Sequence, residues 1–171
     1  VGIERNDTND FSSIFGSGNW GLSQSLKKIT VTNETTVKSN AFYGCQYVEE
    51  IVYDSDITEI GAYAFASCHR LDNVTLPDTL ESIGEWAFSW CYDLSSIVIP
   101  EGVKTIGSYE FANLTALETV VLPSTLETID YGAFYGCIML ESITLPDDLT
   151  SIGNSAFYYC TNLTTINYNG T

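Results

Sequence analysis

Five cysteines are the residues best suited to chemistry, and they recur at one position of a periodic pattern. They are Cys45, Cys68, Cys91, Cys137 and Cys160, and Leu114 takes the same position between the third and the fourth. Thiols could pair as disulfides, bind a metal ion or act as nucleophiles. In a regular stack, however, neighbouring Cβ atoms stay roughly 5 Å apart, whereas a disulfide needs about 3.8 Å. Because a leucine can replace the cysteine, we expect buried free thiols.

The only histidine, His69, is a weak candidate for catalysis. The pattern places the neighbouring Cys68 in the core and His69 outside, so the two cannot act as nucleophile and base. No histidine or carboxylate recurs beside the cysteines as a further metal ligand. Hydrolase, metalloprotease, P-loop and dinucleotide-binding motifs are missing from the sequence as well. We therefore expect no enzyme, no catalytic residue, no cofactor and no metal site.

Acidic residues dominate the charge. The chain has 22 Asp and Glu against six Lys and Arg, a net charge of -16, and after Lys104 it has seven acids and no base. This balance argues against nucleic acid and against an anionic membrane surface, both of which attract basic residues. No apolar run approaches the roughly 18 residues of a membrane span, so we expect no membrane insertion. The acids could serve solubility, a partner with a basic surface, or weak Ca²⁺ binding in turns.

Three aromatic residues stand at one repeat position in successive units: Tyr63, Trp86 and Tyr109. Stacked rings of this kind could simply cover one another on adjacent rungs. They could instead form an exposed binding surface, because Tyr and Trp are favoured at interfaces. We keep this aromatic column (Tyr63, Trp86, Tyr109) as a candidate site for a protein or a glycan.

A repeat of 23 residues positions all of these side chains. It is marked by six phenylalanines at this spacing: Phe42, Phe65, Phe88, Phe111, Phe134 and Phe157. Five of them follow an alanine, and Glu110 is the exception. The unit reads LxxIxLPxxLxxIGxxAFxxCxx, and four prolines keep the same period. So many fixed positions on one period predict a stacked repeat protein.

Each unit can be assigned local structure from its residues. In LxxIxLP the fourth and sixth positions point inward and the fifth outward, as in a β-strand that proline ends. The spacing of Ala-Phe-x-x-Cys fits a single helical turn with one buried face. We therefore predict a right-handed α/β-type solenoid, with a parallel β-sheet on one face and short helical turns on the other.

The outer face of this sheet is the second candidate site. It should present two rows of small polar and β-branched side chains. In the central units these are Thr75, Val98 and Val121 in one row and Asn73, Ser96 and Thr119 in the other. A broad face without a deep pocket suits a protein or polymer better than a small molecule.

The repeat unit resembles that of BspA-like, Treponema-type leucine-rich repeat surface proteins. This resemblance covers residues 26 to 171 and implies a secreted or cell-surface protein of a bacterium. Adhesion to a host or bacterial surface protein would be its role, with glycan binding or a spacer between domains as alternatives. Residues 1–25 are expected to hold a partial repeat with an inserted loop, and 26–171 a single solenoid domain without its C-terminal cap.

Overall fold

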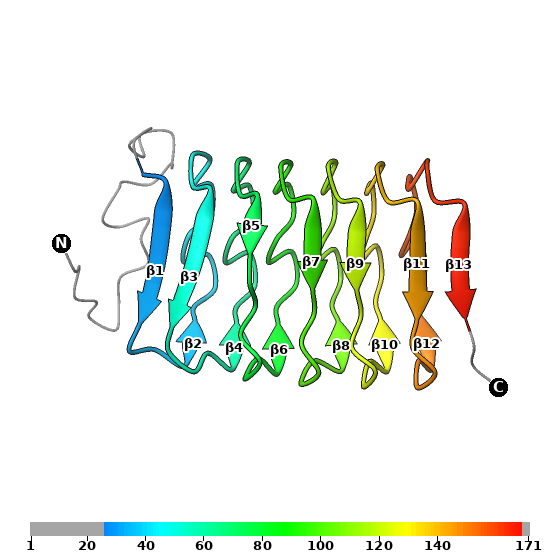
Figure 1. Ribbon diagram of the computed structural model, residues 1–171, viewed down its shortest axis with the longest axis horizontal. Helices are drawn as coiled ribbons and strands as arrows, with labels where there is room; N and C mark the ends of the chain where they lie inside the picture. Colours follow the sequence, from blue (N-terminus) through cyan, green and yellow to red (C-terminus); the bar gives the residue numbers. More distant parts are fainter. Residues whose placement is uncertain (1–25, 169–171) are drawn as a thin grey trace.

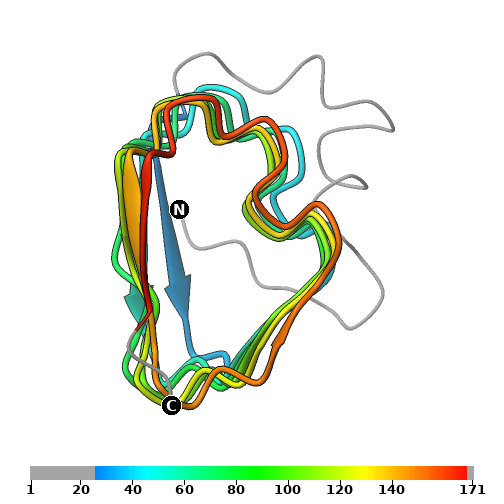
Figure 2. The same ribbon diagram turned by 90° about the vertical axis from the view of Figure 1, so that its right-hand side faces the viewer.

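The computed structural model describes residues 26–168 as a coil of parallel strands (Figure 1). The predicted partial repeat and loop over residues 1–25 lie outside the described residues. Each turn of the coil runs down the front strand, crosses the lower edge and returns at the rear, advancing by one rung (Figures 1 and 2). This path is a right-handed solenoid, as predicted.

The front of the solenoid is a parallel ladder formed by the LxxIxLP segments. Its strands are β1 (Lys28–Thr32), β3 (Glu50–Asp54), β5 (Asn73–Val74), β7 (Ser96–Val98), β9 (Thr119–Val121), β11 (Ser142–Leu145) and β13 (Thr165–Tyr168). Each residue pairs with the equivalent residue of the next unit, as Ile97 does with Val120. Hydrogen bonds join β1 to β3, β3 to β5, β7 to β9, and β11 to β13.

The return segment of each unit forms a second parallel ladder, which the sequence did not predict. It consists of β2 (Thr36–Val37), β4 (Glu59–Ile60), β6 (Ser82–Ile83), β8 (Thr105–Ile106), β10 (Thr128–Ile129) and β12 (Ser151–Ile152). Each strand has only two residues, and in all of them except β12 the second residue is buried, completely so at Ile60 and Ile106. The two ladders therefore enclose the core from opposite sides (Figure 2).

The predicted short helical turns are wrong, since residues 26–168 contain no helix. The Ala-Phe-x-x-Cys segments are instead successive tight turns. The N–H of Phe42 donates to the Ala64 carbonyl of the next rung, whereas the N–H of Ala41 closes a turn onto the Lys38 carbonyl. Because alternate N–H groups bond to the neighbouring rung, the i to i+4 bonds of an α-helix cannot form. No helix able to cross a membrane occurs in this part of the chain.

Positive φ angles, from 54° to 73°, shape these turns at two positions in every rung. The first position holds Asn40, Tyr63, Trp86, Tyr109, Gly132 and Ser155. The second, four residues later, holds Gly44, Ser67, Trp90, Asn113, Gly136 and Tyr159. A residue in this left-handed region interrupts a right-handed helix, which explains why the spacing of apolar residues did not produce one.

The core is a set of columns that run the length of the solenoid, and the phenylalanines form the largest of them. Neighbouring rings stack with centroids 5.3 to 5.7 Å apart. Phe65, Phe88, Phe111 and Phe134 are completely buried, whereas Phe157, in the last complete unit, is only partly so. A unit thus depends on both neighbours to cover its apolar side chains.

One unit departs from the regular rear ladder. No strand pairing joins β6 to β8 within the described residues. The Gly107 N–H, whose counterpart in the preceding unit donates to the Ile60 carbonyl, instead donates to Glu110 Oε2 at 2.7 Å. Glu110 stands where the other units have alanine, and its side chain is completely buried. The carboxyl group therefore replaces a ladder bond at this point.

Candidate functional site

The front sheet presents the outward rows that the sequence predicted. Thr75, Val98 and Val121 are exposed, with Val98 at 61% and Val121 at 48%. The second row, Asn73, Ser96 and Thr119, is exposed beside it. The pairing of Ser96 with Thr119 and of Val98 with Val121 places equivalent side chains next to each other across the strands. We call these six residues the sheet face.

A groove interrupts the sheet face near the lower end of β9 and β11. It has a volume of about 710 Å³, and its walls include Val121, Leu122, Thr144, Leu145 and Pro146. No pairing joins β9 to β11 within the described residues. Leu122 is only partly buried. Its equivalents in the two neighbouring units are buried, since Ile99 is 2% exposed and Leu145 is 5% exposed. Leu122 thus leaves an apolar floor partly open in this groove, a feature that the sequence pattern did not predict.

Carboxylates stand on both sides of this groove. Glu101, Ser124 and Asp147 occupy the same repeat position in three successive units, and Asp148 follows Asp147. Ser124 donates its N–H to Glu101 Oε1 at 3.2 Å and its hydroxyl to Oε2 at 2.9 Å. These bonds, led by that of the Ser124 N–H, lower the pKa of Glu101, so its carboxylate stays charged at neutral pH. The groove therefore combines an apolar floor with fixed negative charge.

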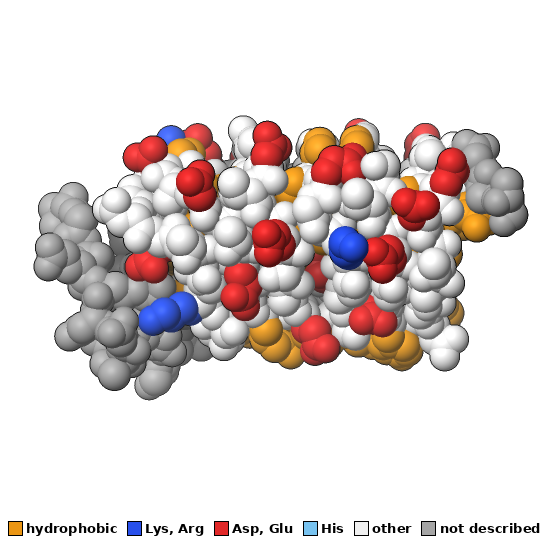
Figure 3. Space-filling view, turned by 90° about the horizontal axis from the view of Figure 1, so that it is seen from below, with side chains coloured by type: hydrophobic (Ala, Val, Ile, Leu, Met, Phe, Trp, Pro, Cys, Tyr) orange, Lys and Arg blue, Asp and Glu red, His pale blue; other side chains and the backbone are white. Residues whose placement is uncertain are grey.

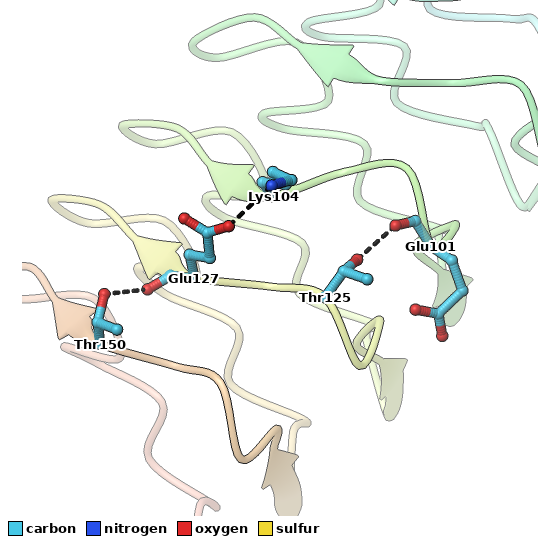
Figure 4. A network of polar contacts seen from close by, with 5 residues as sticks. All are labelled: Glu101, Lys104, Thr125, Glu127 and Thr150. Atoms are coloured by element: carbon cyan, nitrogen blue, oxygen red, sulfur yellow. Dashed lines mark hydrogen bonds and ion pairs between the residues drawn. The ribbon is translucent and has the colours of Figure 1, made fainter.

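The lower edge of the solenoid continues this acidic character (Figure 3). Few basic side chains interrupt the carboxylates there. Lys104 Nζ lies 3.0 Å from Glu127 Oε1 on the next rung, and the Thr150 hydroxyl donates to the Glu127 carbonyl at 2.9 Å (Figure 4). Acidic side chains thus recur along this edge, and its Lys104 is already paired with Glu127.

The aromatic column forms a stack on another part of the surface. The ring centroids of Tyr63 and Trp86 lie 5.9 Å apart and those of Trp86 and Tyr109 4.1 Å apart, with nearly parallel planes. Trp90 stacks on Trp86 at 5.2 Å. Since neighbouring rings cover both faces of Trp86, mainly ring edges remain for a partner. This geometry suits packing between rungs better than stacking of a sugar ring on Trp86.

Backbone strain accompanies this stack. Tyr63, Trp86 and Tyr109 have φ angles of 57°, 61° and 54°, a region that bulky residues rarely adopt. Gly132 holds the equivalent position in the next unit, where a glycine adopts such an angle without steric cost. The ring contacts within the stack offset the strain of the three aromatic residues.

The cysteines are free and buried, as predicted. Four of the thiols lie within hydrogen-bond distance of a phenylalanine carbonyl in the preceding rung. Cys91 Sγ, for example, is 3.3 Å from the Phe65 oxygen. Burial raises the pKa of Cys91 well above that of an exposed thiol. A protonated, buried thiol is neither a nucleophile nor a metal ligand.

His69 lies at the surface beside Tyr92, with ring centroids 4.8 Å apart. Partial burial lowers its pKa, so the imidazole is neutral at physiological pH. Within residues 26–168, no three His, Cys, Asp or Glu side chains are placed to hold a metal ion together.

Comparison with known protein families agrees with this architecture. The family model described as "BspA type Leucine rich repeat region" matches residues 19–137 and 81–171, with six copies. This chain belongs to the BspA-type leucine-rich repeat proteins. The family assignment agrees with the stacked rungs of about 23 residues and with the constant spacing of Phe65, Phe88 and Phe111 along this chain.

Solved structures of bacterial leucine-rich repeat proteins resemble the chain. A leucine rich cell surface protein from Faecalibacterium prausnitzii is 32% identical, with a TM-score of 0.80 over 85% of this chain and 39% of its own. A leucine-rich repeat protein from Bacteroides ovatus is 37% identical, with a TM-score of 0.77 over 82% and 37%. The T. pallidum leucine rich repeat protein is 28% identical, with a TM-score of 0.73 over 84% and 80%.

This BspA-type chain therefore spans less than two fifths of the length of the first two structures. No curated protein matches it. The relatives are of bacterial origin, and one of them is described as a cell surface protein. Repeat solenoids of this family present extended surfaces suited to contacts with other proteins.

Two features of this BspA-type chain escaped the sequence reasoning. The first is the groove at β9 and β11, whose only trace in the sequence is Ser124 at a repeat position that holds the acidic residues Glu101 and Asp147 in the neighbouring units. The broken rear ladder depends on Glu110, which is visible in the sequence as the one departure from alanine before phenylalanine.

Proposed function

We propose that this chain is a non-enzymatic, extracellular interaction module that binds another protein through its sheet face. The observation that carries the proposal is the pair of exposed rows on β5, β7 and β9, which hold small polar and β-branched side chains without a charge. Val98 and Val121 leave about half of their surface or more in solvent at the centre of this face. A flat face of this kind suits a folded protein, since it offers area and regular spacing rather than enclosure.

The extracellular setting and a role in adhesion are part of the same proposal. They are supported by the cell surface description of the Faecalibacterium relative. The acidic lower edge adds support, because a partner with basic residues would be attracted to it. We expect the partner to be a host or bacterial surface protein that carries basic residues.

Substitution on the sheet face tests this proposal. Binding is measured by biolayer interferometry against a panel of immobilised extracellular-matrix proteins. In the Thr75→Glu/Val98→Glu double variant, we expect binding to fall at least about tenfold, because two charges would be desolvated at the contact. Thr105→Glu adds a charge at an exposed position of β8 on the opposite ladder and serves as the control. Equal binding by the sheet-face variant and wild type would rule out this face.

A glycan is the second candidate partner, because the partly exposed rings of Tyr63, Trp86 and Tyr109 leave their edges open at the surface. A glycan array tests this alternative directly. Hits that Trp86→Ala abolishes while Thr75→Glu/Val98→Glu leaves them unchanged would support the column, and an array without hits would remove it.

A further inference from the structure

We propose that the groove between β9 and β11 binds a lysine- or arginine-bearing segment of the protein partner. This inference rests on the proposed protein-binding function and assigns the chemistry of one part of the contact. It is carried by the groove itself, its apolar floor and the carboxylates that line it on both sides. The sheet face alone does not imply it, because the face carries no charge.

Three successive units build the groove. Val121, Leu122 and Ser124 of the middle unit form its floor. Glu101 comes from the unit before, and Asp147 and Asp148 come from the unit after. Rungs of a parallel ladder are about 4.8 Å apart, so the two walls lie roughly 10 Å from each other. An extended side chain fits between walls at this separation.

Ser124 carries a short hydroxyl side chain at the repeat position where its two neighbouring units carry the acidic residues Glu101 and Asp147. Ser124 instead holds the Glu101 carboxylate through its N–H and hydroxyl. The negative charge of Glu101 is therefore fixed at the rim and does not have to be ordered on binding.

The charge of the groove selects the occupant. The three acidic side chains of its rim have no basic neighbour in the groove lining. The lysine on the same edge, Lys104, is paired with Glu127, and no Lys or Arg follows it in the sequence. An anionic segment would be repelled by these carboxylates. A purely apolar segment would partly desolvate them without offering a partner for their charge.

Lysine and arginine match both parts of the groove. Their methylene chains can lie along Val121 and Leu122, while the cationic group reaches the carboxylates at the rim. A bare metal ion matches less well. It would not use the apolar floor, and no cluster of three metal-ligating side chains occurs in residues 26–168. The proposed occupant is therefore a basic side chain with aliphatic neighbours, presented by an extended segment.

Titration with a defined peptide tests this assignment. The probe is the blocked peptide Lys-Val-Lys-Val-Lys, and binding is followed by ¹⁵N–¹H correlation spectra of the whole chain. We expect the largest shift changes at the amides of Val121, Leu122 and Ser124. The Asp147→Asn/Asp148→Asn variant should bind about three- to tenfold more weakly, and binding should weaken as salt is added.

Asp78→Asn/Glu81→Gln is the matched control. It removes the same two charges from exposed positions on the acidic edge outside the groove, and Asp78 holds the repeat position of Asp147. We expect this control to bind the peptide like wild type. Equal weakening in both double variants, shift changes elsewhere, or equal binding of Glu-Val-Glu-Val-Glu would overturn the groove assignment.

The same variants separate this inference from the function on which it rests. If Thr75→Glu/Val98→Glu abolishes binding of the protein partner but Asp147→Asn/Asp148→Asn does not, the groove assignment is refuted and the sheet face is retained as the binding surface. Loss in the groove variant alone would support the groove and refute the sheet face as the main contact.

Discussion

Glu110 places a carboxyl group where the other units place the methyl group of alanine. Oε2 accepts the Gly107 N–H, but Oε1 has no hydrogen-bond partner among the described residues. Burial raises the pKa of Glu110 well above its ordinary value, so the folded protein holds this proton more tightly than the unfolded chain does. Stability that depends on this proton is present at acid pH and is lost as the pH rises past the ordinary carboxyl range.

We therefore expect Glu110→Ala to stabilise the protein at pH 8 by about 1 to 3 kcal/mol, because it removes a buried, incompletely bonded carboxyl group. At about pH 4 the gain should be smaller, since the wild-type carboxyl is then protonated in the folded state and mostly protonated in the unfolded state. Urea unfolding at the two pH values measures the difference. The exposed Glu118→Gln is the control, and a gain that does not change with pH would contradict the burial of Glu110.

The cysteines allow a second prediction for single residues. Cys68, Cys91 and Cys137 are completely buried, and burial raises the pKa of Cys91. A thiol-specific reagent at pH 8 should therefore leave these three unmodified in the native protein and modify them in denaturant. Mass spectrometry of the labelled peptides reads out the result. Rapid native labelling of Cys91 would show that the column is open to solvent.

Among the elements, the front strands and the phenylalanine column could be predicted from the sequence. The alternation around Val74 and Leu76 and the spacing of Phe65 and Phe88 are specific signals. The rear ladder could not be predicted, because two-residue strands are too short for an alternating pattern. The helical turns were predicted wrongly, because a run of tight turns places buried residues at the same spacing. The positive φ of Trp86 distinguishes a tight turn from a helical turn, but this angle is visible only in the structure.

Phe88→Ala tests the contribution of one column element. Phe88 is completely buried between Phe65 and Phe111, so its loss leaves a cavity that the neighbouring rungs cannot fill. We expect a loss of about 3 to 5 kcal/mol in the free energy of unfolding. Phe157→Ala, in a partly buried position, should cost less. A loss below about 1 kcal/mol for Phe88→Ala in denaturant melts would contradict its place in the core.

The charge of the whole molecule should limit its stability. With a net charge of -16, the folded chain repels itself, and the acids gather on its edges rather than pairing with bases. Added sodium chloride screens exposed charges beyond about 10 Å at 0.1 M and should raise the melting temperature. Calorimetry between low salt and about 0.5 M salt measures this effect. A melting temperature that falls with salt would mean that attractive pairs such as Lys104–Glu127 dominate.

The solenoid as a whole offers three surfaces: a neutral sheet face, an acidic lower edge with its groove, and an aromatic column. The sequence predicted the sheet face and the aromatic column, and it showed the excess of acidic residues. It could not show that the rings of Tyr63, Trp86 and Tyr109 stack face to face on one another. Nor could it show the groove, because the partial exposure of Leu122 is a feature of the packing and not of the repeat pattern. We propose the sheet face as the surface that contacts a protein partner.

Hydroxyl-radical footprinting of the complex with a captured protein partner tests this central claim most directly. The method compares the oxidation of each side chain in the free and bound chain by mass spectrometry. We predict that Val98 and Val121 become protected on binding, while Tyr158 and Tyr159, which are equally exposed in the free chain, keep their oxidation rates. Protection of Tyr63, Trp86 and Tyr109 with unchanged oxidation of Val98 would contradict the sheet face as the binding surface.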